Sequence, residues 1–156
     1  MSFWLLLEKF HGHIGLLAMA LCLHPPLALR RARRPAWATR VAAYLATASV
    51  IAVNVLGWYI YPEYRNEVKL DLYRYARFWG LAFEVKEHLA WYSMATAFAG
   101  AVMVWHSDDA RGIALRRPII GLYLLTFVLV AITAILGVMI ASINGFDDAI
   151  LPTGPR

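Results

Sequence analysis

The chain has 156 residues, a length that suits a single domain. Hydrophobic residues make up 61% of it, and its charges cluster between long apolar runs, which is typical of an integral membrane protein. The net charge of +5 comes largely from basic clusters beside these runs, so it indicates membrane topology and contact with lipid rather than binding to nucleic acid. Cys22 is the only cysteine, which excludes an internal disulfide and a metal centre built on paired cysteines.

The first apolar run covers about residues 3–29 and carries an unusual number of polar groups. Because charge is costly inside a membrane, we expect these groups to face a bundle interior, a membrane surface or a partner subunit. The sequence His24-Pro25-Pro26 predicts a kink or the end of the helix. The polar residues of this run are Glu8, Lys9, His11, His13 and His24.

The second apolar run covers about residues 37–61 and ends in aromatic residues that mark a membrane surface. Pro62 is predicted to break this helix. The following connection, residues 62–83, interleaves charged and aromatic side chains, a mixture that suits a helix lying in the membrane interface. We expect Tyr73, Phe78 and Trp79 to face lipid or a partner there. A solvated loop is the alternative.

The third apolar run covers about residues 84–106 and begins with the charged stretch Glu84-Val85-Lys86-Glu87-His88. The fourth covers about residues 118–142 and carries no charge within it. Four runs of membrane-spanning length predict an all-α protein: a single domain forming an integral membrane four-helix bundle, with an interfacial helix between its second and third spans.

Arginines flank the connections between the first two runs and between the last two, which predicts that both connections face the cytoplasm. Both termini and residues 62–83 would then lie outside. The basic residues within 62–83 oppose this orientation. We expect an integral protein of a bacterial inner membrane.

The five histidines occur only in the first and third runs. On helical spacing His13 and His24 share one face, about 20° apart, and His88 and His106 share another. Two helices with histidines at two depths could hold a flat metal-bearing cofactor between them, since imidazole is a common axial ligand of haem iron. His11 is the rival to His13, because a kink near Gly12 would rotate it inward.

This placement resembles the membrane cytochromes b, whose transmembrane helix pairs carry histidines near each membrane face and exchange electrons with quinone. The resemblance implies an outer haem b held by His13 with His88 and an inner one held by His24 with His106. Arginines of the connection would pair with the outer propionates; the candidates are Arg65, Arg74 and Arg77. It also implies quinone as a partner.

Of the two histidine pairs, the outer one is better supported, because His106 borders the turn at Asp108 and Asp109. The rise from His13 to His24 is about 17 Å, whereas that from His88 to His106 is about 27 Å, so two haems are level only if a helix tilts or bends. The alternative for each histidine is an ordinary residue of the membrane interface. Glu84, Lys86 and Glu87 are interpreted as interface charges, not as a catalytic set.

The sequence therefore predicts a membrane-embedded haem b electron-transfer subunit of a larger redox or quinone-linked complex. We expect it to contact lipid and other membrane subunits. Its small size favours a subunit over a self-sufficient enzyme, and we identify no catalytic residues. The alternatives are a non-catalytic structural or assembly subunit, a chlorophyll-type pigment-binding subunit, and a small transporter that moves protons through Glu8 and its histidines.

Overall fold

A computed structural model describes residues 3–31, 35–107 and 111–144, and all secondary structure in these residues is helical. The predicted all-α class is confirmed. In chain order the elements are α1 (Phe3–Arg31), α2 (Trp37–Tyr64), the π-helical segment η1 (Arg65–Lys69), α3 (Leu70–Tyr75), α4 (Arg77–Trp105) and α5 (Gly112–Asn144).

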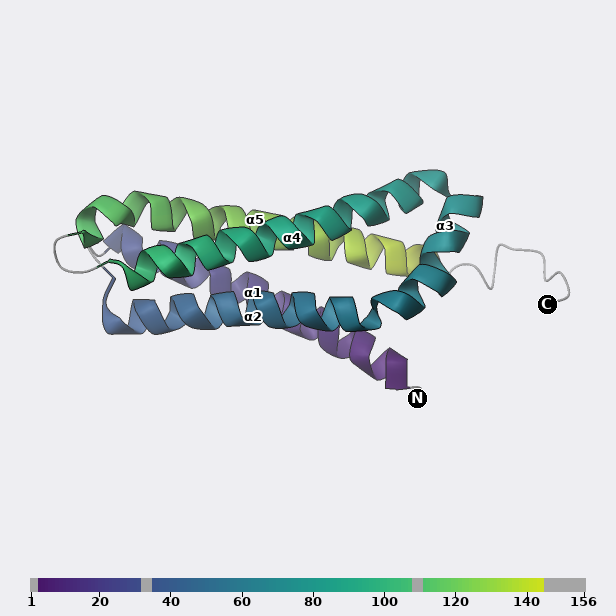
Figure 1. Cartoon of the computed structure of the whole chain (residues 1–156), viewed down its shortest axis with the longest axis horizontal. Helices are drawn as coiled ribbons and strands as arrows, with labels where there is room; N and C mark the ends of the chain where they lie inside the picture. Colours follow the sequence, from purple (N-terminus) through teal and green to yellow (C-terminus); the bar gives the residue numbers. More distant parts are fainter. Residues whose placement is uncertain (1–2, 32–34, 108–110, 145–156) are drawn as a thin grey trace, which may run out of the picture.

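The four long helices lie side by side (Figure 1). Helix α1 packs against α2 and α5, and α4 packs against α5 and α2, so α1 and α4 lie mainly against the other two helices and not against each other. One end of the molecule holds the N-terminal part of α1, the end of α5 and the residues from η1 to α3. We call it the connection end. The opposite end, where α1 and α4 end and α2 and α5 begin, is called the loop end.

Three helices are long and apolar enough to cross a membrane: Leu6–Arg31 of α1, Trp37–Tyr64 of α2 and Gly112–Ser142 of α5. The third predicted span lies in α4, which is not among them. The first part of α4 carries Glu84, Lys86 and Glu87, and small and aromatic residues lower the hydropathy of the remainder. The described chain thus contains three helices of the length and composition expected of an integral membrane protein.

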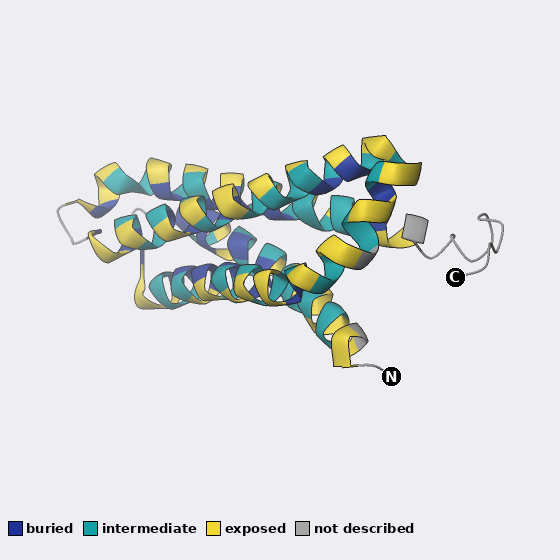
Figure 2. Ribbon diagram, turned by 45° about the vertical axis from the view of Figure 1, so that its right-hand side comes forward, coloured by how far each residue is buried: buried dark blue, intermediate teal, exposed yellow. Residues whose placement is uncertain are grey.

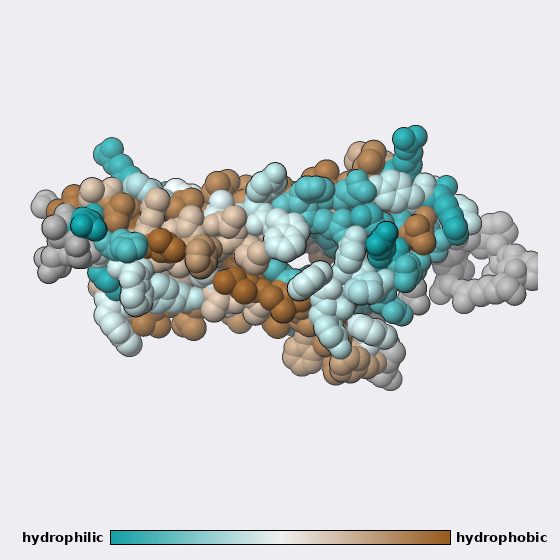
Figure 3. Space-filling model, viewed as in Figure 1, coloured by the Kyte–Doolittle hydropathy of each residue, from teal (hydrophilic) through white to brown (hydrophobic). Residues whose placement is uncertain are grey.

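Exposed residues occur along every long helix (Figure 2), and many of them are large hydrophobic side chains. On α5, for example, Ile135 is 58% exposed and Val138 is 70% exposed. In the view of Figure 3, hydrophobic side chains predominate over the loop half and hydrophilic ones gather towards the connection end. An apolar exterior over several helices is unfavourable in water and suits contact with lipid.

The tightly packed core lies around Tyr123 of α5, which has no exposed surface. Small residues of the neighbouring helices let the backbones approach this ring; they are Ala43, Ala46, Ala97 and Gly100. The Tyr123 hydroxyl donates to the carbonyl oxygen of Ala43 at 2.9 Å and lies 3.0 Å from Thr47 Oγ1. Thr47 Oγ1 in turn donates to the Ala97 carbonyl at 3.1 Å, so one polar cluster joins α2, α4 and α5.

The prolines do not end the helices. The prediction that Pro62 breaks the second helix is wrong, because α2 continues to Tyr64 and leads directly into η1. Pro25 and Pro26 lie inside α1, and Pro118 lies inside α5, which begins six residues earlier at Gly112. A proline removes one backbone donor, and in a membrane protein neighbouring helices and local changes of helical pitch compensate for it. A π-helical segment, η1, follows three residues after Pro62.

The connection is helical, as predicted, but it continues α2 and α4 instead of forming a separate helix. The break falls at Ala76, whose φ of −146° and ψ of 61° lie outside the helical region. Tyr73 does not simply face outward, since its ring packs over Gly80: a Cβ at position 80 would lie 3.0 Å from Tyr73 Cγ. Phe78 is 72% exposed, as expected of a residue that faces lipid or a partner, whereas Trp79 is half-buried.

Candidate functional site

The structure separates the five histidines into one inward-facing and four outward-facing rings. His13, His24, His88 and His106 are exposed, whereas His11 is half-buried. On α1 the buried positions include Ala18, Cys22 and Leu29, and both His13 and His24 lie off this stripe. The two histidines of the first span thus share an outward face, as their spacing predicts.

His13 and His88 have the same local hydrogen bond. His13 Nδ1 lies 2.6 Å from the carbonyl oxygen of Lys9, and His88 Nδ1 lies 2.8 Å from that of Glu84. A carbonyl oxygen only accepts, so Nδ1 must carry the proton in both rings. In the neutral imidazole Nε2 is then left with a lone pair, the state that a metal ligand requires.

The packing of the helices does not bring His13 and His88 together. Both rings are exposed, and their helices α1 and α4 pack mainly against α2 and α5. At the loop end His24 and His106 are likewise exposed, and His106 forms the C-terminal cap of α4. Within the described ranges no group of three or more His, Cys, Asp and Glu side chains is placed to hold a metal ion.

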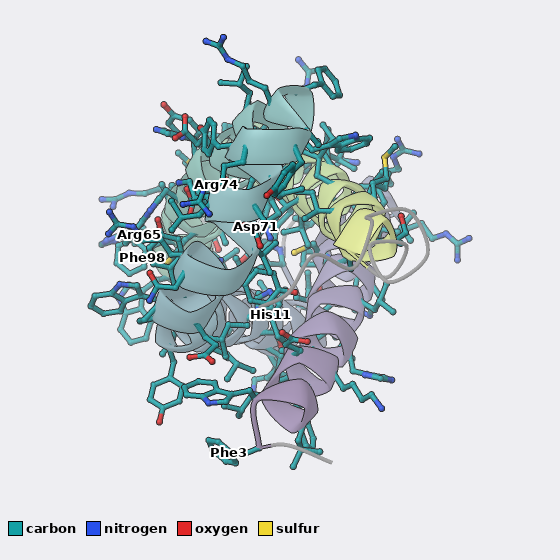
Figure 4. The ribbon with its side chains drawn as sticks, turned by 90° about the vertical axis from the view of Figure 1, so that its right-hand side faces the viewer. Phe3, His11, Arg65, Asp71, Arg74 and Phe98 are labelled. Carbon is teal, nitrogen blue, oxygen red and sulfur yellow. The ribbon has the colours of Figure 1, made fainter. Side chains whose placement is uncertain are left out.

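The three arginines proposed as propionate partners are all exposed at the connection end. Arg74 Nη1 lies 3.7 Å from Asp71 Oδ1, one turn away on the same helix. Figure 4 looks onto this end and shows Arg65 and Arg74 projecting from the outer side of the connection, with His11 nearer the centre of the view. Arg77 begins α4.

Lys69 fastens the connection to α4. Its Nζ lies 2.9 Å from Glu87 Oε2 and 3.6 Å from Glu84 Oε1, with 15% of the Lys69 side chain exposed. Burial alone would lower the pKa of Lys69, but the hydrogen bond and charge of Glu87, together with a smaller contribution from Tyr61, outweigh it and hold that pKa above its ordinary value. Glu84 and Glu87 therefore anchor the connection in addition to lying at the start of the third predicted span.

Lys86 points into the protein and not into the interface. Its Nζ lies 4.6 Å from the ring centroid of Phe83 and 5.7 Å from that of Tyr64, and its Cδ lies 4.0 Å from the site of a Cβ at Gly137 of α5. Aromatic faces attract an ammonium group and offset part of its desolvation. The interpretation of residues 84–87 as plain interface charges missed this position.

His11 lies in the same region and faces α2. Its Cε1 would be 2.8 Å from a Cβ at position 57, so only glycine leaves room for this ring. His11 Nδ1 is buried without a hydrogen-bond partner in the described structure. Helical spacing in the sequence was the one indication that His11 and Lys86 turn inward. His11 is seven residues before Ala18, and Lys86 seven before Ser93, so each lies close to the buried stripe of its helix.

No protein-family model matches this sequence, and no curated protein or solved structure is significantly similar to it.

Proposed function

We propose that the protein is a membrane-embedded haem b electron-transfer subunit of a larger redox or quinone-linked complex. The observation that supports it is the shared geometry of His13 and His88. Each ring is oriented by a carbonyl oxygen one turn away on its own helix, so that Nε2 can act as a donor to iron. The donor chemistry of these two residues fits a haem axial ligand.

The exposure of both rings bears on where a haem would lie. In this packing His13 and His88 face away from the interior, so each would ligate iron on the outside of its helix, towards lipid or a neighbouring subunit. When bound, haem supplies a reversible one-electron couple. The chain would contribute fixed imidazoles in an apolar setting, and Arg65, Arg74 and Arg77 would be the cations available to propionates.

His24 and His106 are proposed for a second haem at the loop end on position alone. Neither has the carbonyl hydrogen bond that His13 and His88 share in the described structure. The two pairs therefore differ in whether a hydrogen bond orients the imidazole rings. This difference favours haem ligation at the connection end.

We further propose that α4 crosses the membrane, which gives a membrane four-helix bundle. Helix α4 packs extensively along α5, the most apolar of the three candidate spans. A helix alongside a membrane-spanning helix must itself be at membrane depth. Both termini and the connection would lie outside a bacterial inner membrane, as the arginines of the loop end favour.

A reduced-minus-oxidised absorbance spectrum of the protein, purified with its native partners, tests this function. We expect sharp haem b bands. His88→Ala and His13→Ala should each remove the haem that the replaced residue would ligate or leave that haem five-coordinate, whereas His106→Ala should leave the low-spin bands from the connection end unchanged. Circular dichroism should show that helix content is retained in every variant.

Two results would contradict the proposal. Wild-type protein with no haem in its native complex would refute the function and favour a structural or assembly subunit. Chlorin bands would favour a pigment-binding subunit. A His88→Ala protein with full haem and an unchanged low-spin spectrum would refute the ligand assignment alone.

A further inference from the structure

The loop end collects arginines that divide into two groups by their contacts. Arg116 of α5 donates from Nε to the Leu29 carbonyl at 2.6 Å and from Nη2 to the Arg30 carbonyl at 3.0 Å. Arg40 donates to the carbonyl oxygen of Ser107. The last carbonyls of a helix have no partner within it, so Arg116 satisfies the end of α1 and joins it to α5.

The other group is exposed and borders two shallow hollows. On α1 a hollow of about 430 Å³ is lined by His24, Leu27, Ala28, Arg30 and Arg31. On α5 a hollow of about 460 Å³ is lined by Ile113, Ala114, Arg116 and Arg117. Arg116 bonds to the backbone of Arg30, so the segments of α1 and α5 that carry the two hollows are in contact with each other.

The chemistry of these two hollows suits an amphipathic anion. Each hollow combines guanidinium groups with an exposed aliphatic side chain, Leu27 at 56% exposure and Ile113 at 61%. A soluble anion such as phosphate would contact the arginines and leave this apolar surface unused. A phospholipid supplies both a phosphodiester and acyl chains.

The position of the hollows matches the depth of a lipid headgroup. Both lie at the ends of helices that are long and apolar enough to cross a membrane, since the candidate spans include Arg31 of α1 and Gly112 of α5. We propose that these two hollows bind an anionic phospholipid, with its phosphodiester between Arg30, Arg31 and Arg117 and its acyl chains along α1 and α5. Arg116 shapes the site by holding the two helices together.

The connection end provides a matched comparison, because it also has three exposed arginines. There Arg74 lies 3.7 Å from Asp71, and Lys69 is neutralised by Glu87. Among the described residues, those that line the two hollows at the loop end include no acidic side chain. Equal loss of positive charge at the two ends should therefore have unequal effects on lipid binding.

The test uses the full chain in a neutral detergent, with phosphatidylglycerol or phosphatidylcholine added in increasing amounts. Thermal unfolding and native mass spectrometry measure the stabilisation and the number of lipids bound. Phosphatidylglycerol should stabilise the wild type, and phosphatidylcholine should not. The triple variant Arg30→Gln, Arg31→Gln, Arg117→Gln should bind phosphatidylglycerol roughly a hundredfold more weakly, since each basic residue near an anionic headgroup changes affinity about fivefold.

The control variant is Arg65→Gln, Arg74→Gln, Arg77→Gln, which removes the same charge from the other end. The lipid-induced shift is measured within each variant, so any change in haem content of the control does not enter the comparison. The control should retain the response to phosphatidylglycerol. An equal loss in both variants, equal stabilisation by phosphatidylcholine, or equal stabilisation by inorganic phosphate alone would each overturn the proposal.

Discussion

Replacing Gly100 by alanine probes the tightest contact between α4 and α5. A Cβ at position 100 would lie 2.9 Å from Tyr123 Cε2 and 3.3 Å from Cδ2 and Cζ. The Tyr123 ring has no exposed surface, and its hydroxyl bonds to the Ala43 carbonyl and contacts Thr47. The ring can therefore make room only by moving away from its hydroxyl partners.

The expected cost follows from three contributions. Overpacking of a filled core costs about 1–3 kcal/mol. Weakening the hydroxyl bond of Tyr123 adds about 0.6 kcal/mol, the average for a hydrogen bond between helices in a membrane protein. Alanine has a helix propensity about 1 kcal/mol better than glycine, which offsets part of this loss. Gly100→Ala should thus reduce the free energy of unfolding by about 0.6–2.6 kcal/mol.

A second substitution separates the ring contact from general effects on α4. Tyr123→Phe keeps the ring, so Gly100→Ala should remain destabilising in that background. Tyr123→Ala removes the ring, so there Gly100→Ala should be neutral or stabilising by up to about 1 kcal/mol. Unfolding by sodium dodecyl sulfate in mixed micelles, followed by circular dichroism, measures all six proteins, namely the three Tyr123 backgrounds with and without Gly100→Ala.

Gly121→Ala on α5 is the matched control, because nothing lies within 4 Å of its Cβ position. This variant should be neutral or slightly stabilised. If Gly100→Ala is equally destabilising with and without the Tyr123 ring, the contact between the two residues is not its cause, and the packing argument fails.

Two further predictions concern Lys69 and the membrane topology. Lys69→Met should lower the free energy of unfolding by about 1 kcal/mol at pH 7. Because the pKa of Lys69 is raised in the folded protein, this difference should persist below the unfolded pKa of about 10.4 and vanish as pH rises through the folded value. Unfolding measured between about pH 7 and pH 11 tests this. A Lys69→Met loss that does not depend on pH would contradict it. In a Cys22→Ala background, Tyr75→Cys should react with an impermeant maleimide in intact cells, and Arg31→Cys only after permeabilisation; the reverse pattern would invert the proposed topology.

Hydropathy located the apolar part of each helix but not its ends. It placed the fourth span at about 118–142, whereas α5 extends from Gly112 to Asn144. Backbone hydrogen bonding continues through polar residues and through Pro118, because a helix does not need to end where its lipid-facing surface ends. The π-helical η1 was not predictable, since it depends on how α2 and α4 are joined by packing.

The sequence identified the candidate histidines, but it only partly predicted whether their side chains face inward or outward. Helical spacing predicted that His13 and His24 share a face, but which face turns inward depends on the neighbouring helices. Local sequence likewise grouped Lys86 with Glu84 and Glu87 as one charged stretch. Tertiary packing separates them: the two carboxylates bind Lys69, and Lys86 extends over aromatic rings.

The residues that fill the interior differ between the two ends of the molecule. Around Tyr123, small residues and hydroxyl bonds hold α2, α4 and α5 in close contact. Towards the connection end the interior instead contains the Lys86 ammonium group and a His11 nitrogen without a partner in the described structure. Apolar residues of similar volume would pack there at lower cost, because buried polar groups lose hydration. Packing alone does not account for their presence. They lie at the same end as His13 and His88, so this end is where experiments on chemistry should begin.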